Sequence, residues 1–433
     1  NYFHFVIIRL YTSKSKSKKI YLENMTKRLL LLCVLFNVYS GLSAQFIPNS
    51  IYREYVWTTP ETGEAFIRVG GKNGYQNQSG ELPGYLQRGK QLLFPDSFDL
   101  FKAASAEVVV ERVLSHEDSR NLSISFNGNT QHYFGEPSSI PAPASEYMYH
   151  TSQRIKIPIG AFSLELDTNQ RWNWPQNLVY AIILRITYFP DKSTVSPPVI
   201  RHASPAEVPE NSVVSIAANS AFVAVDYALE ATDTDWGGSG DFHGVHWQTL
   251  RGKANRTIGS SDVGPDFPIQ WITTWLPNQR RKMKLHARAI DREGLYHVGV
   301  PLNYLELAKR GHGIALIVPT KVPKNWVTRM GTFSEELELS IQPERVVAYQ
   351  LLWTSWSPCY ANGIYLNGHL LWSRSGICDA YAAHNPIYSS SHELRFLKAG
   401  TNVLATGKTP LFNGELVNGM EVQWPGIMMK IRY

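Results

Sequence analysis

Hydrophobic and polar residues alternate over short segments along most of the chain beyond residue 45. Alternation with a period of two is typical of half-buried β-strands, and Gly, Pro, Asn and Asp punctuate these segments as turn residues do. The clearest segments are residues 106–112, 122–126, 154–159, 180–188, 222–229, 284–290, 346–354 and 426–433. Only residues 302–309 have a pattern closer to that of a helix, and we expect a short connecting helix there. The pattern therefore predicts an all-β protein built from sandwiches, without the regular helices of a barrel or a Rossmann fold.

Proline-rich stretches divide this β-rich region. Residues 189–198 read Phe-Pro-Asp-Lys-Ser-Thr-Val-Ser-Pro-Pro, an extended polar run that is typical of a linker because Pro fixes φ and restricts the preceding residue. A second border falls near residues 300–302. Each resulting part has an ordinary domain size. We predict three sandwiches and one linker, at residues 45–190, 191–200 (the linker), 201–302 and 303–433.

The two outer parts share features that indicate duplication of one unit. Asn127-Gly128 follows a strand-like segment in the first part, and Asn367-Gly368 follows one in the last. Asn-Gly accepts the positive φ values of a tight hairpin turn. The closing segments, residues 180–188 and 425–433, are also alike and lie at nearly the same spacing from these turns. Chance similarity between short β-strands is the alternative explanation.

Two segments of the last part form a recognisable pattern: Ile-Tyr-Leu-Asn-Gly-His at residues 364–369, and Phe-Leu-Lys-Ala-Gly-Thr-Asn-Val-Leu-Ala at residues 396–405. The pattern resembles the galactose-binding-like jelly roll, which serves as the sugar-binding domain of β-galactosidase-type glycosidases and occurs in many carbohydrate-binding modules. The similarity covers residues 334–433 well and residues 66–188 less well. It implies a jelly-roll fold and sugar binding. Hydrolysis is not implied, because the sequence has no (β/α)₈ barrel, which alone needs about 250 residues.

The middle part, residues 201–302, resembles an immunoglobulin-like or fibronectin-like sandwich, since its apolar residues alternate as in half-buried strands. Such a domain most often spaces and orients its neighbours. The predicted fold class is therefore two jelly-roll β-sandwiches joined by an Ig-like β-sandwich. Within the middle part we expect Trp271 and Trp275, four residues apart on one face of a strand, to pack inside.

Charge gives little support for a nucleic-acid or membrane partner. The chain has 42 Lys and Arg against 36 Asp and Glu, with a pI near 9.0. This excess falls within residues 1–44, so residues 45–433 are close to neutral. A global electrostatic footprint for nucleic acid or for an anionic membrane is therefore missing.

The N-terminal region predicts export. Met25 is followed by Lys27 and Arg28, then by an apolar run over residues 29–36 and small residues up to Ala44. This order is typical of a secretory signal peptide over residues 25–44, and the run is too short for the roughly 20 residues of a spanning helix. We expect a mature chain without a transmembrane segment, secreted to the extracellular space or the periplasm. Residues 1–24 are interpreted as an upstream or non-native extension.

Export also changes the interpretation of the cysteines. Cys359 and Cys378 remain in the mature chain, and in an oxidising compartment we expect them to form a disulfide worth roughly 3 kcal/mol. Two unpaired buried thiols are the alternative.

Two clusters have the composition of a sugar-binding site, in which flat aromatic faces and paired donors and acceptors meet a pyranose. The predicted ligand-binding residues are Arg171, Trp172, Asn173, Trp174 and Gln176 in the first cluster, and Trp356, Tyr360 and Asn362 in the second. We expect Trp356 to be exposed in a loop and Trp353 to lie in the core. The alternative for the first cluster is that its tryptophans cap the sandwich edge.

A third cluster, residues 233–246, is rich in carboxylates. It departs from the EF-hand template, but Asp233, Asp235 and Asp241 with backbone carbonyls would suit an irregular Ca²⁺ site. A glycine-rich turn between two strands is the alternative. No cofactor is required by any feature of the sequence.

No catalytic motif is present: the sequence has no Gly-x-Ser-x-Gly, phosphate loop or His-Glu-x-x-His. We therefore predict a secreted protein that binds extracellular polysaccharide or glycan without catalysis. The first alternative is a polysaccharide-cleaving enzyme, a lyase or a hydrolase, using one of several histidines with a neighbouring Tyr or Arg. These histidines are His116, His150, His312 and His384. The second alternative is a structural or adhesive surface protein.

Overall fold

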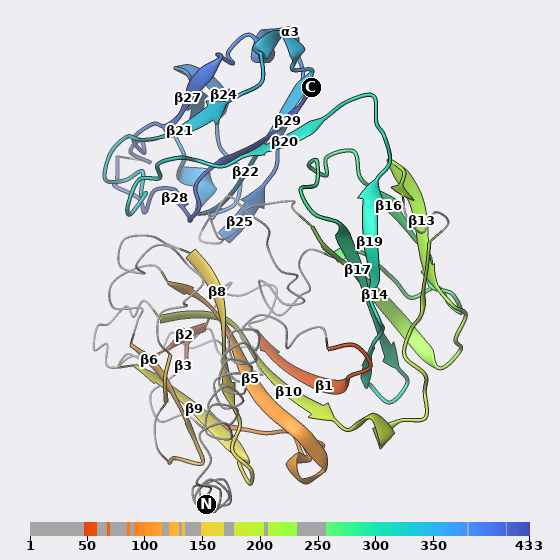
Figure 1. The fold of residues 1–433 in the computed structure, drawn as a ribbon. Coiled ribbons are helices and arrows are strands. Elements are labelled where there is room, and N and C mark those ends of the chain that lie inside the picture. Colours follow the sequence, from red (N-terminus) through yellow and green to blue (C-terminus); the bar gives the residue numbers. More distant parts are fainter. Residues whose placement is uncertain are drawn as a thin grey trace, which may run out of the picture. The chain divides into compact units, whose positions relative to one another are not determined.

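The computed structural model describes residues 47–58, 67–69, 85–86, 91–114, 121–129, 132–134, 149–168, 177–202, 207–231, 257–378, 381–412 and 414–433. Regular structure in these residues is almost entirely β, which confirms the predicted fold class (Figure 1). One α-helix is described, α3 (Ser391–Leu394), whose first turn is capped by Ser390 and Glu393. The predicted signal peptide lies outside the described residues. In the described part of the chain, no helix has the length and apolar character needed to cross a membrane.

The first sandwich packs a larger sheet against a smaller one. The strands of the larger sheet are β1 (Ile51–Thr58), β2 (Ile67–Val69), β3 (Tyr85–Leu86), β5 (Ala103–Leu114), β8 (Tyr149–Lys156) and β10 (Asn177–Tyr188). The smaller sheet has the order β4 (Gln91–Leu93), β9 (Ser163–Thr168), β6 (Leu122–Phe126) and β7 (His132–Tyr133). Apolar residues of both sheets, such as Val108, Ile124 and Ile182, form its fully buried core.

The second sandwich continues the larger sheet of the first. Its strands in that sheet are β12 (Glu207–Val208), β14 (Phe222–Glu230), β15 (Thr257–Ser261), β17 (Met283–Asp291), β18 (Tyr296–Val298) and β19 (Leu302–Leu307). A three-stranded sheet covers them: β11 (Ile200–His202), β13 (Asn211–Ile216) and β16 (Ile269–Ile272). As predicted, Trp271 packs into this core and is only 3% exposed. Trp275 does not share its strand face, because β16 ends at Ile272 and Trp275 lies half-buried in the turn that follows.

The prediction of a helix over residues 302–309 is wrong, because β19 occupies most of this segment. Residues Leu302–Leu307 alternate along a strand that pairs with β17 on one side and with β12 on the other, and Leu305 is fully buried. Strand pairing available at both edges overrides a weak helical periodicity. This pairing also attaches β19 to the second sandwich, beyond the border predicted near residues 300–302.

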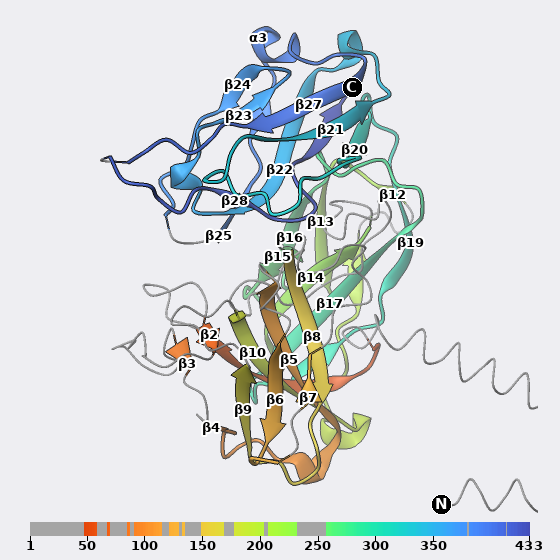
Figure 2. The same cartoon turned by 90° about the vertical axis from the view of Figure 1, so that its left-hand side faces the viewer.

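The third sandwich has a six-stranded and a four-stranded sheet (Figure 2). The first contains β20 (Ile314–Ile317), β22 (Ala348–Trp356), β25 (Tyr381–His384), β26 (Ile387–Tyr388), β28 (Glu421–Val422) and β29 (Met428–Arg432). The second has the order β21 (Phe333–Leu339), β27 (Gly400–Thr406), β23 (Ile364–Leu366) and β24 (His369–Trp372). Trp326 and Trp353 are each 1% exposed in the core between them, which confirms the expected burial of Trp353.

Strand order supports duplication of the outer sandwiches. The order β1-β10-β5-β8 in the first corresponds to β20-β29-β22-β25 in the third, and β4-β9-β6-β7 corresponds to β21-β27-β23-β24. Both predicted Asn-Gly turns have positive φ, 53° at Asn127 and 51° at Asn367. Each Asn side chain also accepts a backbone N–H from the adjacent strand region: Asn127 from Phe162 at 2.9 Å and Asn367 from Val403 at 3.0 Å. Topology and turn chemistry therefore repeat together.

A buried polar cluster joins the first two sandwiches, where β1 pairs with β18. Arg288 donates to Asp226 at 2.8 Å and to the Tyr52 hydroxyl at 3.0 Å, and lies 3.8 Å from Glu54. Arg185 binds the same Glu54 carboxylate, with its Nε at 2.7 Å. Both guanidinium groups are at least nine-tenths buried. Paired charges of this kind fix one geometry, because removing either partner leaves the other charge buried.

Candidate functional site

The predicted second sugar cluster lies at one end of the third sandwich, in loops tied by a disulfide. Cys359 and Cys378 are joined, with their Cα atoms 5.2 Å apart. Ser357 has a φ of 45°, and this left-handed residue turns the chain from β22 into a short 3₁₀ helix, Pro358–Tyr360. The Cys359 N–H donates to the Ile377 carbonyl at 3.0 Å, so both sides of the disulfide loop are also held by their backbones.

Tyr360 meets two residues that the sequence did not single out, and Asn362 follows two positions later in the same loop. The rings of Tyr360 and Phe412 are 5.2 Å apart and nearly perpendicular, at 74°. The Arg374 guanidinium lies 5.6 Å from the Phe412 ring centre. Tyr360 and Phe412 are half-buried, and Asn362 is exposed. We call these four residues, Tyr360, Asn362, Arg374 and Phe412, the disulfide-end cluster; it offers aromatic surface, an amide and a guanidinium in one place.

Trp356 does not belong to this surface, and the expectation that it is exposed is wrong. It is the last residue of β22, pairs with Tyr381 of β25 and Glu421 of β28, and is only 8% exposed. Strand β22 continues further than the sequence suggests because partners flank it on both sides, and the turn begins only at Ser357. Trp356 therefore supports the loops from beneath.

Ser355, which precedes Trp356 in β22, lies close to His384 of the paired strand β25. The Ser355 hydroxyl is 3.3 Å from the Nε2 of His384, and the His384 ring stacks on Trp353 with centroids 4.6 Å apart. Burial lowers the pKa of His384 to about 4, so the imidazole is neutral at physiological pH. Ser355 is fully buried. A hydroxyl enclosed in this way does not present a nucleophile to a polymer.

The carboxyl group of Glu421, near this end of the sandwich, has a strongly perturbed pKa. Burial raises its pKa to about 7, and the Arg329 and Arg68 charges oppose that rise. Its backbone pairs with Trp356, so the group lies beside the disulfide loops and not within the disulfide-end cluster.

The described tyrosines whose pKa is shifted are not poised as lyase-type bases. Burial is the largest cause in each resolved pKa shift of a tyrosine, and it raises the pKa every time. A tyrosine that abstracts a proton needs the opposite shift. Tyr52, although next to Arg288, is buried and accepts a hydrogen bond from that guanidinium.

Several predicted site residues lie outside the described residues. These are Arg171, Trp172, Asn173, Trp174 and Gln176 of the first sugar cluster, and Asp233, Asp235 and Asp241 of the carboxylate loop. Their roles stay predictions. Within the part of the chain that the structure describes, no group of three His, Cys, Asp or Glu side chains is arranged to hold a metal ion.

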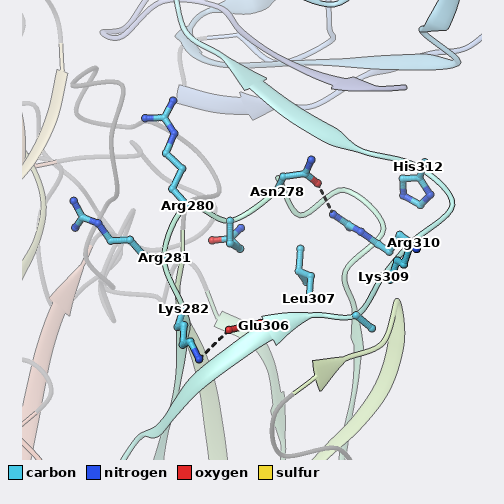
Figure 3. A pocket seen from close by; sticks show the side chains of 11 residues that line it. Asn278, Arg280, Arg281, Lys282, Glu306, Leu307, Lys309, Arg310 and His312 are labelled. Atoms are coloured by element: carbon cyan, nitrogen blue, oxygen red, sulfur yellow. Dashed lines mark hydrogen bonds and ion pairs between the residues drawn. The ribbon is translucent and has the colours of Figure 1, made fainter.

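A basic groove of about 510 Å³ lies between the loop that precedes β17 and the segment that follows β19 (Figure 3). Arg310 fixes its shape by donating to the carbonyls of Thr273 and Leu276 and to the Asn278 side chain, at 3.0–3.1 Å. Asn278 in turn binds the backbone of Ile314, donating its N–H at 2.8 Å. The lining residues are Asn278, Gln279, Arg280, Arg281, Lys282, Glu306, Leu307, Ala308, Lys309, Arg310 and His312.

The sequence did not predict the contact of Phe412 with Arg374, nor the basic groove. Nothing local links Phe412 to Tyr360, since only the fold brings the loop after β27 to the loop after β22. A signal for the groove was present: Arg280-Arg281-Lys282 and Lys309-Arg310 are basic runs in a region of balanced charge. The net charge of residues 45–433 conceals such local runs, because acidic residues elsewhere balance them.

No family model and no curated protein matches the chain. Solved structures align at 9–10% identity and low TM-scores. BuGH86wt in complex with neoagarooctaose has a TM-score of 0.22, and the alignment covers 54% of this chain and 32% of that one. The plant receptor-like kinase FER has a TM-score of 0.18, with 77% and 79% covered. An exo-β-1,3-galactanase from Phanerochaete chrysosporium, solved with galactose, has a TM-score of 0.15, with 72% and 95% covered.

Proposed function

We propose that this protein binds extracellular polysaccharide or glycan chains through the loop ends of its outer sandwiches, without cleaving them. The observation that carries the proposal is the disulfide-end cluster. Its partly exposed aromatic rings suit the apolar faces of a pyranose, and the side chains of Asn362 and Arg374 suit its hydroxyl groups.

Duplication supports a second site of the same kind. Phe412 lies in the connection from β27 to β29, residues 407–427, which also includes β28. The equivalent loop of the first sandwich joins β9 to β10 over residues 169–176, and it contains Trp172 and Trp174. The first predicted sugar cluster and the disulfide-end cluster, through Phe412, thus draw residues from equivalent connections of the repeated topology. Two weak sites on one chain would add avidity toward a polymer that reaches both.

Binding is favoured over cleavage by the state of the groups near the disulfide-end cluster. Ser355 is enclosed, and burial keeps His384 neutral with its ring stacked on Trp353. Cleavage by a lyase or hydrolase would need an exposed acid and base on one groove.

Ala substitutions at Tyr360 and Phe412 test the proposal. Each should weaken polysaccharide binding by about three- to tenfold, the scale of one aromatic contact. Phe162→Ala is the matched control, because Phe162 is 61% exposed and lies at the far end of β9 from loop 169–176. Asn362→Ala serves as a second variant, since this exposed residue should not affect folding. Unchanged affinity in all three cluster variants, with melting temperatures preserved, would refute a site here.

A further inference from the structure

The basic groove lies apart from the disulfide-end cluster. Among the described residues, its lining contains five Lys and Arg side chains and one carboxylate, that of Glu306. Lys282 forms an ion pair with that carboxylate at 2.9 Å, and both side chains of the pair are more than half exposed. Arg280, Arg281 and Lys309 are exposed on the rims of the groove. Glu210, 3.7 Å from His312, adds a second carboxylate at one end of the groove. Five cations still outnumber these two acids, and an anionic ligand would relieve the repulsion between them.

Hydrogen bonds between its walls hold the groove in shape, so it differs from a loose group of surface lysines. Arg310 donates three hydrogen bonds to uncharged oxygens, so these contacts hold its guanidinium without cancelling its charge. Asn278 accepts one of them and also accepts the Ile314 N–H at 3.3 Å, which ties the two walls together. Figure 3 shows Lys282 turned toward Glu306, with Leu307 between that pair and Arg310.

From these observations we infer that the groove binds the anionic groups, carboxylate or sulfate, of an acidic polysaccharide. The inference rests on the proposed function and names the charge class of its ligand. Guanidinium groups form paired hydrogen bonds with carboxylate and sulfate oxygens, and Arg280 and Arg281 present two of them at the exposed rim, while Arg310 adds its charge. Leu307 and Ala308 give apolar surface between the cations, and a volume near 510 Å³ is ordinary for a ligand site.

Nucleic acid fits the groove less well. Single strands bind grooves in which bases stack on aromatic rings, and the lining that the described residues form contains no Phe, Tyr or Trp. The balanced charge of residues 45–433 also lacks the extended basic face typical of duplex binding. A polymer that carries its charge on sugars needs neither feature.

The test compares polymers that differ only in charge. Purified protein is titrated with chondroitin sulfate and its desulfated form, and with polygalacturonate and its methyl ester. We expect the sulfated or carboxylated polymer of a pair to bind more tightly, with affinity falling as salt rises. The pair that shows the difference identifies the anionic group.

The variant Arg280→Gln/Arg281→Gln should bind that acidic polymer about tenfold more weakly. Its control, Lys156→Gln/Arg292→Gln, removes the same charge from exposed residues elsewhere and should leave the affinity within about twofold. Lys309→Gln tests the other rim and should weaken binding in the same direction.

Three results would overturn the inference. One is equal binding by the groove variant and its control. Another is equal binding of the two members of both pairs by the wild-type protein; this result leaves the proposed function standing, whereas failure to bind any polymer removes both. The third is duplex DNA bound as tightly as the best polysaccharide, which would make the groove a general polyanion site.

Discussion

At the residue scale, the carboxyl group of Glu421 makes stability depend on pH. Its pKa in the folded protein is about 7, above the ordinary 4.5, because of burial. A raised acid pKa means that the folded state holds the proton more tightly. The contribution to stability is therefore complete below pH 4.5 and is lost as pH rises through 7. Since the side chain keeps partial exposure, we expect the loss to be about 1–2 kcal/mol.

The variant Glu421→Gln should flatten this part of the profile. Urea unfolding at pH 5 and pH 8 should show a smaller difference in free energy than the wild-type protein does. Glu335, whose pKa is also raised by burial, remains in the variant and keeps part of the same trend. An undiminished difference in the variant would show that Glu421 does not titrate in this range.

We expect the buried guanidinium of Arg288 to contribute strongly to stability. Replacing it by Met leaves Glu54 and Asp226 without their shared cation in the cluster between the first two sandwiches. Loss of one partner from a buried ion pair costs about 3–5 kcal/mol. Arg292→Met, at an exposed turn, is the control and should stay within about 0.5 kcal/mol. Equal unfolding midpoints for the two variants would mean that the cluster adds nothing to stability.

At the scale of elements, the repeated Asn-Gly turns make the duplication testable. Asn367 has positive φ, accepts the Val403 N–H, and donates to the Phe396 carbonyl at 2.7 Å. Asn127 has the same conformation and also donates to a carbonyl, that of Gly160, at 3.1 Å. Asn→Ala at either position should therefore cost about 2 kcal/mol.

Thermal unfolding of Asn127→Ala and Asn367→Ala measures this cost. Asn→Gly at each site restores the backbone freedom and should recover part of the loss, while the side-chain hydrogen bonds remain missing. A large effect at one turn and none at the other would argue against equivalent roles.

Alternation along the chain was sufficient to predict the strands and the fold class, because it records which face of each strand is buried. It was insufficient where a partner strand decides the outcome. Segment 302–307 became β19 through pairing at both edges, and Trp356 was buried because β25 and β28 extend the ladder to it. Half of the disulfide-end cluster was predictable from composition, namely Tyr360 and Asn362. Phe412 and Arg374 join it only through contacts between distant loops.

At the scale of the whole molecule, the sheet that runs from β1 into β18 makes the second sandwich continuous with the first. The spacer predicted from sequence is therefore joined to its neighbour by strand pairing and by buried charges, in addition to the polar linker. The polysaccharide-binding account assigns to the outer sandwiches the loops that contact sugar, and to the middle region the groove that selects charge.

Affinity electrophoresis of the purified protein tests this account most directly. The protein is run through gels that contain different polysaccharides, and each polymer is sized again afterwards. We predict retardation in at least one gel, with the length of that polymer unchanged. Shortened polymer would contradict the account and identify an enzyme, and unaltered mobility in every gel would contradict it in favour of an adhesive protein.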